Sequence, residues 1–174
     1  FITNRKVLVS VAAGVPIAAV KKWAGKECKV IRVMPNIAMS VGCGAAALSY
    51  EMPITYNEFM AVRGIFELSG IVEVIPETRM NEIVAVNGSG AVYLYSLANS
   101  MIKGAVNQGI EPDIAKRLTF QTLLGATQMM ITKDDDVDTL IRKVCSPNGT
   151  TAKIVNILEK RGMEQIISDS MLSC

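Results

Sequence analysis

The character of the sequence changes at Pro76, and this change constrains the fold more than any other feature. Before Pro76, apolar and β-branched runs predict strands at residues 6–11, 29–33 and 71–75, with a weaker candidate at 45–50. Helical stretches separate the first strand from the second and the third from the fourth. The order β-α-β-β-α-β predicts an α/β sheet with helices against parallel strands.

Two helices are expected within this α/β region. Pro16 suits the first turn of a helix, which should run to about Trp23. Thr55 can cap a second helix that continues to about Ser69, and Gly70 can end it. Each helix therefore connects two predicted strands and can cover one face of their sheet.

After Pro76 no strand signal appears, and helical periodicity continues to the end of the chain. Helices are expected at residues 79–86, 91–107, 112–132 and 136–145, and from 151 onward, where Gly162 can divide the last stretch. We therefore place a domain boundary between two regions. The α/β domain covers residues 1–76, and the all-α domain covers residues 77–174.

The longest predicted helix is apolar around most of its circumference between residues 118 and 130. Its apolar residues there are Leu118, Phe120, Leu123, Leu124, Ala126, Met129 and Met130. A helix that is apolar all round is buried, either in a large core or against a second subunit. The helical region is short for a large core, which favours a second subunit. A compact monomeric bundle is the alternative that stays open.

Composition argues against several classes of function. The net charge is +2 and the basic residues are scattered, so we expect no nucleic-acid partner. Charged residues interrupt every apolar stretch, so we expect no membrane-spanning segment. The chain has no His, which removes Ser–His and Cys–His nucleophiles, and its four Cys lack CxxC spacing. We therefore expect no metal site, and reduced thiols that indicate a cytoplasmic protein.

The segment Ser146–Thr151 carries the most chemical information in the sequence. It lies between two predicted helices and offers three hydroxyls together with the free N–H groups of a helix's first turn. These donors and the helix dipole suit an anion such as a carboxylate. An ordinary capped turn is the alternative, because Ser, Pro, Asn, Gly and Thr are common turn residues.

Two other motifs have simpler interpretations. Gly42–Ala47 matches the loose dinucleotide pattern G-x-G-x-x-G/A, but it precedes a strand-like run instead of a phosphate-binding helix. Asp134–Asp136 places three carboxylates in a row, and on a turn they point in different directions. Asp136 is a good N-cap for the next helix. Capping is therefore the favoured interpretation of this acidic triplet.

Five segments, in order, resemble the pyrroline-5-carboxylate reductases, and together they extend over essentially the whole chain. They are Val9–Gly14, Ile31–Asn36, Gly88–Tyr93, Gln121–Ala126 and Ser146–Thr151. The sequence departs from the usual family pattern at Ile37-Ala38, Asn87, Ala91, Lys143 and Asn148. Because Asn tolerates a left-handed backbone, Asn148 need not disrupt its turn.

The resemblance implies a fold and an activity. The chain would form the C-terminal part of a Rossmann-type sheet followed by a helical dimerisation domain, with the family's glycine-rich phosphate loop upstream of Phe1. The implied reaction is the last step of proline biosynthesis, the reduction of 1-pyrroline-5-carboxylate to L-proline by NADPH or NADH. A protonated cyclic imine is already electrophilic, so the protein mainly positions the reactants, which fits the missing His.

The resemblance also implies partners and leaves alternatives open. The partners would be a cyclic imino acid and a second copy of the chain, in a homodimer or larger homo-oligomer. One alternative is a related imine or hydroxyacid reductase. The other is a non-catalytic dimerisation module, because the phosphate loop is absent from this sequence. For the same reason we expect the 174-residue chain alone to bind dinucleotide weakly.

Residue by residue, the resemblance assigns two candidate groups and no catalytic residue. The candidate cofactor-binding residues are Ala12, Ala13, Gly14, Asn36 and Lys143. The candidate substrate-binding residues are Glu77, Ser146, Gly149, Thr150 and Thr151, with the last four around the substrate carboxylate.

Overall fold

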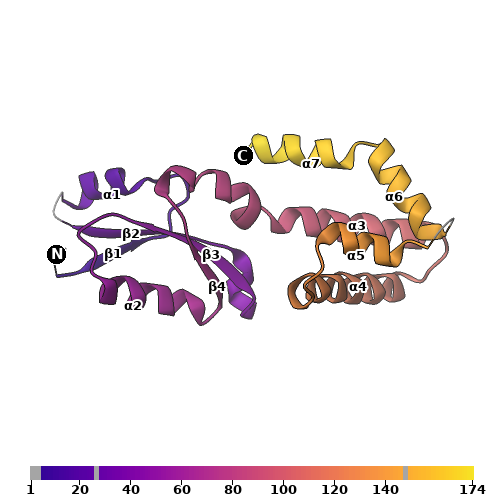
Figure 1. The fold of residues 1–174 in the computed structure, drawn as a ribbon, viewed down its shortest axis with the longest axis horizontal. Coiled ribbons are helices and arrows are strands. Elements are labelled where there is room, and N and C mark those ends of the chain that lie inside the picture. The colour runs from indigo at the N-terminus through magenta and orange to yellow at the C-terminus, as the bar shows by residue number, and fades with distance from the viewer. Residues whose placement is uncertain (1–4, 26–27, 147–148) are drawn as a thin grey trace. The chain divides into compact units, whose positions relative to one another are not determined.

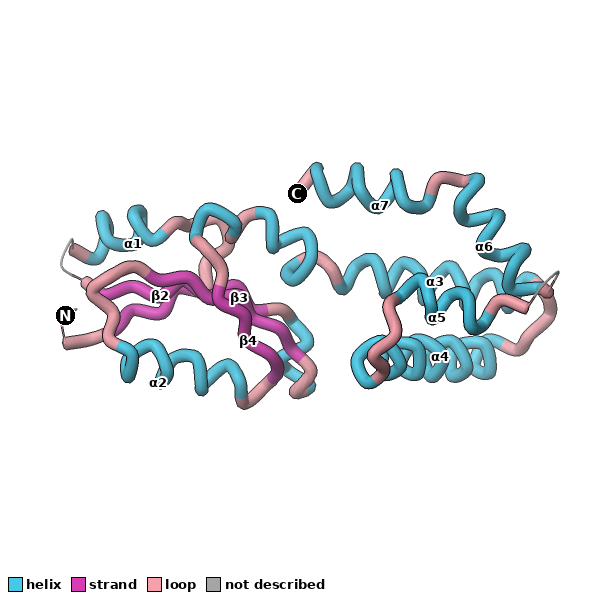
Figure 2. The backbone as a smooth tube through the Cα atoms, in the orientation of Figure 1, coloured by secondary structure: helices cyan, strands magenta, loops and turns pink. Residues whose placement is uncertain are grey.

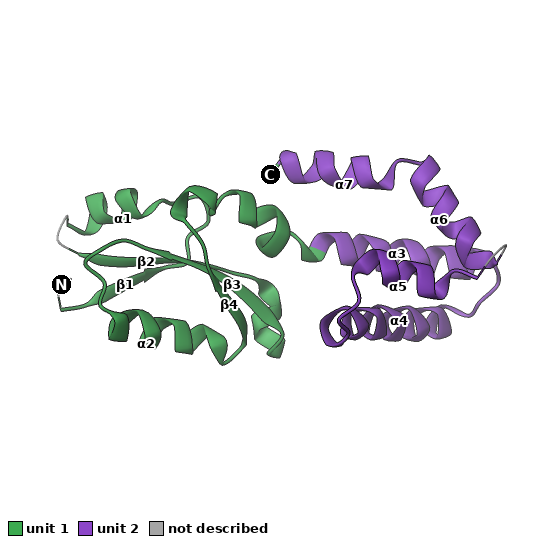
Figure 3. Ribbon diagram, in the orientation of Figure 1, with its two compact units in different colours: residues 1–91, 174 green, residues 92–173 purple. Residues whose placement is uncertain are grey.

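The computed structural model describes residues 5–25, 28–146 and 149–174, and forms two compact units. Phe1 and Asn148 lie outside these ranges. Figure 3 shows the first unit, residues 1–91, in green and the second, residues 92–173, in purple. This division lies within the region assigned above to the all-α domain. The domain boundary between residues 76 and 77 stays a prediction, and each unit is described by itself below.

The first unit is built on a four-stranded sheet. In spatial order its strands are β1 (Val7–Ser10), β2 (Lys29–Pro35), β3 (Gly44–Tyr50) and β4 (Gly70–Val74). Helices α1 (Ile17–Ala24) and α2 (Tyr56–Glu67) cover opposite faces of it (Figure 1). The predicted order of strands and helices is confirmed, so the α/β region folds as its sequence pattern indicates.

The strand directions differ in one place from the expectation of a parallel sheet. β1 and β2 are parallel, and so are β3 and β4, but β2 and β3 are antiparallel. Residues 36–43, which join β2 to β3, are too few for a parallel crossover, since that takes a dozen or more residues. The expectation is therefore wrong at this pair.

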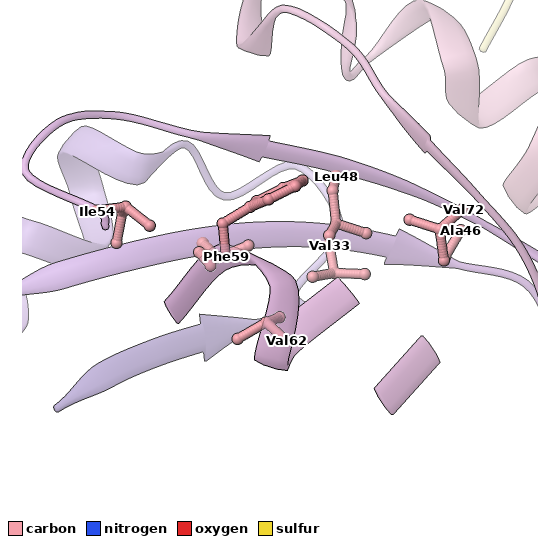
Figure 4. Close-up of a cluster of buried hydrophobic side chains, with 8 residues drawn as sticks. Val33, Ala46, Leu48, Ile54, Phe59, Val62 and Val72 are labelled. Atoms are coloured by element: carbon pink, nitrogen blue, oxygen red, sulfur yellow. The ribbon is translucent and has the colours of Figure 1, made fainter. Parts of the chain in front are cut away.

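Each face of the sheet has its own hydrophobic cluster. Ile31 and Val33 of β2 and Leu48 of β3 pack between the sheet and α2. Helix α2 contributes Phe59 and Val62 to this cluster (Figure 4). On the opposite face, Val30 packs with residues of α1. Because side chains alternate along a strand, β2 supplies both clusters in turn and is buried on both faces.

Helix α2 begins with a capping box. Thr55 Oγ1 accepts from the amide of Glu58 at 3.3 Å, and Glu58 Oε2 accepts from the amide of Thr55 at 2.9 Å. Glu58 Oε1 also lies 2.7 Å from Lys29 Nζ at the start of β2. The Lys29 ammonium and then the Thr55 amide and hydroxyl lower the pKa of Glu58 to about 2.

Glu58→Gln is expected to lower the melting temperature at pH 7 but to have little effect near pH 2. The folded-state pKa lies below the ordinary value of 4.5, so the carboxylate stabilises the fold above pH 4.5. That contribution disappears as the pH falls through about 2. Thermal melts of both proteins across this range measure it. Glu67→Gln, which removes only a surface pair with Arg63 on the same helix, is the control.

The segment after β4 differs from the single helix expected at residues 79–86. It forms a 3₁₀ turn at Glu77–Arg79 and a π-helix at Val84–Gly88. The π-helix ends where the Ser89 amide donates to Val84 O at 2.7 Å. A Cβ at Gly90 would collide with the carbonyl oxygen of Val86, so glycine permits this close backbone approach.

The second unit is entirely helical among its described residues. Its helices are α3 (Ala91–Asn107), α4 (Pro112–Thr132), α5 (Val137–Val144), α6 (Thr150–Lys160) and α7 (Met163–Leu172). Figure 2 shows them as separate cyan coils joined by short loops. Asp136 caps α5 by accepting from the Thr139 amide at 2.6 Å, as predicted, and Gly162 turns the chain with φ 71°. The helical region is therefore confirmed.

The helices of the second unit bury very little of themselves. Among its described residues only Ala98, Ala115 and Thr119 are buried. Large apolar side chains stay open, including Leu118 at 60% and Phe120 at 50% exposed. A single copy therefore does not cover the apolar surface of this unit. In the described part of the chain, no helix combines the length and apolarity needed to cross a membrane.

Candidate functional site

The loop between β1 and α1 presents backbone with little side-chain cover. Ala12, Ala13 and Gly14 are all exposed and follow β1 after one intervening residue, Val11. Gly14 has φ 72°, and no neighbouring atom lies within 4 Å of the place where its Cβ would be. Ligands of α/β folds bind at the carboxyl ends of parallel strands. This loop therefore leaves room for a ligand to approach the main chain.

Asn36 follows β2 at the same edge of the sheet, because β1 and β2 run parallel. Its amide donates to Ala45 O at 3.1 Å, and its Oδ1 accepts from the Ala45 amide at 3.2 Å. These bonds join the end of β2 to the start of β3. Three of the predicted cofactor residues, Ala12–Gly14, and Asn36 thus share one edge of the first unit.

Glu77 is engaged by the protein itself. Its Oε1 accepts from the amide of Ile17 at 2.6 Å and lies 3.5 Å from Nη1 of Arg32. Arg32 is only 3% exposed, and its Nη2 donates to Asn81 Oδ1 at 3.2 Å. The carboxylate thus joins α1 to β2 through a partly buried ion pair. A substrate contact of Glu77 stays a prediction.

Asn87 is a buried polar residue to which the sequence analysis assigned no role. Its Nδ2 donates to Met34 O at 2.7 Å, while its Oδ1 has no partner among the described residues. Asn87 and Asn36 line a cavity of about 270 Å³ whose other walls are mostly Ala, Ile and Val. The only signal in the sequence was that Asn87 departs from the family pattern.

The predicted anion-binding segment forms the entrance to α6. The Gly149 amide donates to Ser146 O at 2.9 Å, and a Cβ on Gly149 would collide with Ser146 Oγ. Gly149 is the N-cap and has no side chain to accept from the first turn, which also contains no acidic residue. Among the described residues, no side chain is seen to cap the first turn with Thr150 and Thr151, so its amides can serve an external acceptor.

The sequence left open an ordinary turn at Ser146–Thr151 whose own side chains cap the next helix, and the geometry bears on this alternative. Thr151 is the second residue of α6, so it does not occupy the N-cap position. No described side chain caps this helix, in contrast to α5, where Asp136 does so. The entrance to α6 thus has the free donors and the positive end of the helix dipole that an anion needs.

Lys143 lies in the last turn of α5, shortly before this loop. Its Nζ forms an ion pair with Asp135 Oδ2 at 2.5 Å, and both residues precede Ser146 in the second unit. The neighbouring Asp136 has its pKa lowered by the amide and then the hydroxyl of Thr139. Asp135 and Asp136, two carboxylates of the triplet Asp134–Asp136, thus both contact residues of α5. A cofactor contact of Lys143 stays a prediction.

The candidate residues fall into two groups. The structure places Ala12, Ala13, Gly14, Asn36 and Glu77 in the first unit, and Lys143, Ser146, Gly149, Thr150 and Thr151 in the second. In the second unit, Ser146, Gly149, Thr150 and Thr151 lie together at the entrance to α6, whereas Lys143 lies in α5 and pairs with Asp135.

Comparison with known proteins identifies the family. Residues 77–174 match the family model described as pyrroline-5-carboxylate reductase dimerisation. A pyrroline-5-carboxylate reductase of Methanosarcina acetivorans is 31% identical over 98% of this chain and 63% of its own length. Pyrroline-5-carboxylate reductase 2 of Bacillus subtilis is 30% identical over 93% of this chain and 58% of its own length.

A solved structure agrees with these sequence relatives. The Plasmodium falciparum pyrroline carboxylate reductase with NADP bound superposes with a TM-score of 0.92 at 29% identity, over 98% of this chain and 68% of that one. The chain spans between 58% and 61% of the length of the first curated relatives that it matches. On the family model and the sequence relatives together, the chain belongs to the pyrroline-5-carboxylate reductase family.

Proposed function

We propose that this protein is a cytoplasmic oxidoreductase that reduces 1-pyrroline-5-carboxylate to L-proline with NADPH or NADH. The observation that carries the proposal is the entrance to α6, with its uncapped first-turn amides and three hydroxyls, in a chain of this family. A carboxylate of the substrate fits there, because an anion meets several donors and the helix dipole at once. The free thiols of Cys28, Cys43 and Cys145 fit a reducing compartment.

The protein's part in the proposed reaction is positioning. Ser146, Thr150 and Thr151 supply hydroxyls, and Gly149 leaves their loop tight enough for the amides of α6 to converge. When bound, the nicotinamide cofactor supplies the hydride. No side chain needs to protonate an imine that is already a cation, so the absence of His is no obstacle.

The loop Ala12–Gly14 fits a dinucleotide cofactor. Its residues are exposed and small, and the space beside Gly14 is open, so a cofactor can contact the main chain there. Asn36 lies at the same edge, and Lys143 is a further candidate in the second unit. The relative from Plasmodium falciparum is described with NADP bound, which supports NADPH as the first cofactor to test.

The proposed assembly is a homodimer or a larger homo-oligomer. The second unit leaves large apolar side chains exposed on α3 and α4, and the matching family model is described as a dimerisation region. Light scattering at micromolar protein is expected to give at least twice the chain mass of 18.8 kDa. A mass of one chain would contradict the assembly.

A non-catalytic dimerisation module is the second candidate, because the chain spans only about three fifths of its curated relatives. The two candidates separate in one assay. Pyrroline-5-carboxylate is mixed with NADPH or NADH and a form of the protein extended upstream of Phe1 to include the phosphate-binding loop that the family resemblance predicts. Proline formation that matches cofactor oxidation supports the reductase. Dimerisation without oxidation of either cofactor would support the non-catalytic dimerisation module.

A further inference from the structure

The cap of helix α1 comes from a residue far along the chain. Pro16 occupies the N-cap position and has no side-chain acceptor, and the first turn of α1 contains no acidic residue. Glu77 Oε1 takes this role by accepting from the Ile17 amide at 2.6 Å. Ile17 is fully buried in the folded chain, so its N–H depends on the Glu77 carboxylate for a hydrogen-bond partner.

Glu77 is itself held by a buried cation. Arg32 on β2 is 3% exposed and places Nη1 3.5 Å from Glu77 Oε1, while its Nε has no partner among the described residues. Removal of the carboxylate would leave this guanidinium buried, with Asn81 Oδ1 as its remaining acceptor among the described residues. Such a buried charge resists the loss of its counter-ion. The pair therefore fixes the position of the carboxylate.

The same residues adjoin the candidate cofactor loop. Arg32 is the register partner of Ser10, the last residue of β1, so the ion pair lies where the loop starts. Inside the loop the only backbone bond is long, from the Val15 amide to Ala12 O at 3.4 Å. The sheet register holds the first end of the loop, and Glu77 holds the second end at Ile17.

We propose that Glu77 is a positioning residue for the loop Ala12–Gly14, and that it acts on cofactor affinity through the N-terminus of α1. The inference rests on the proposed function only where it concerns the cofactor. Loss of the cap removes the hydrogen bond from Glu77 at the α1 end of the loop. That end then depends on the packing of Ile17 and on Pro16 O, so the backbone that faces the cofactor gains mobility. Cofactor binding then requires that the loop be ordered again, which lowers affinity.

Hydrogen exchange at the Ile17 amide tests the bond from this amide to Glu77, and the measurement does not require an active enzyme. Glu77→Ala is expected to reduce protection of this amide by about tenfold or more, because a local opening replaces the bond. Glu77→Gln keeps a carbonyl oxygen for the amide and should retain most of the protection. Glu82→Ala removes an exposed carboxylate that pairs with Arg79 and is the matched control. Unchanged protection in Glu77→Ala would show that Glu77 does not fix the N-terminus of α1, and the proposal would be wrong.

Steady-state kinetics tests the consequence. In a form of the protein that reduces the imine, Glu77→Ala should raise KM for NADPH by about tenfold, whereas loss of the predicted substrate contact of Glu77 would raise KM for the imine. If Glu77→Ala does not fold, Arg32→Met with Glu77→Gln removes both charges and should restore the low KM. Lost protection at Ile17 with an unchanged cofactor KM would overturn the positioning role. An inactive unmutated enzyme would instead refute the proposed function and leave the exchange result standing.

Discussion

Leu118→Asp is expected to weaken self-association by roughly a thousandfold. Leu118 is 60% exposed on α4 in one copy, and Ile114 and Met129 are exposed at positions on the same side of this helix. Hot-spot residues contribute about 2 kcal/mol or more each, and in a two-fold symmetric interface the substitution occurs twice. The expected loss of association free energy is about 4 kcal/mol, and burial of a carboxylate without a partner increases this loss further.

Sedimentation across a range of protein concentrations measures this effect. Gln128→Asp is the matched control, because it puts the same charge on an exposed polar position of α4, one turn after Leu124. Circular dichroism of both variants establishes whether the helices remain. If the Leu118→Asp protein sediments like the unmutated one, the side of α4 that carries Ile114, Leu118 and Met129 does not contact another copy.

The fold of the first unit was largely predictable because its signals are local. The β-branched run in Val30–Val33 predicts a strand, and Thr55, which can cap a helix, predicts where α2 begins. The π-helix at Val84–Gly88 was not predictable, since its geometry depends on long-range contacts such as that from Asn87 Nδ2 to Met34 O. Propensity carries no signal for such a contact.

The candidate site divides in the same way. The free donors at the entrance to α6 follow from sequence, because the N-cap Gly149 has no side chain to accept from the first-turn amides and the first turn has no acidic residue. The use of Glu77 does not follow, since its partner amide lies sixty residues away and no spacing rule connects them. Local sequence therefore indicates which amides a helix leaves free, but it does not indicate the distant hydrogen-bond partner of a carboxylate such as Glu77.

Thr151→Ala is expected to lower kcat/KM for the imine by roughly ten- to a hundredfold in an active form of the protein. Thr151 stands in the uncapped first turn of α6, where its hydroxyl and amide can both donate to the substrate carboxylate. The loss of one hydrogen bond to a charged group costs about 1.5–3 kcal/mol. The N-cap of α6 is Gly149, so a loss of helix stability should not accompany the change.

Two further variants make this result specific. Thr151→Ser keeps the hydroxyl and should restore most of the activity. Thr132→Ala removes a hydroxyl that bonds only the Gln128 carbonyl of its own helix, and it should leave kcat/KM unchanged. NADPH affinity should be equal in all of them, because Thr151 is assigned to the substrate alone. If Thr151→Ala keeps full kcat/KM while its melting temperature falls, the hydroxyl stabilises α6 and the carboxylate binds elsewhere.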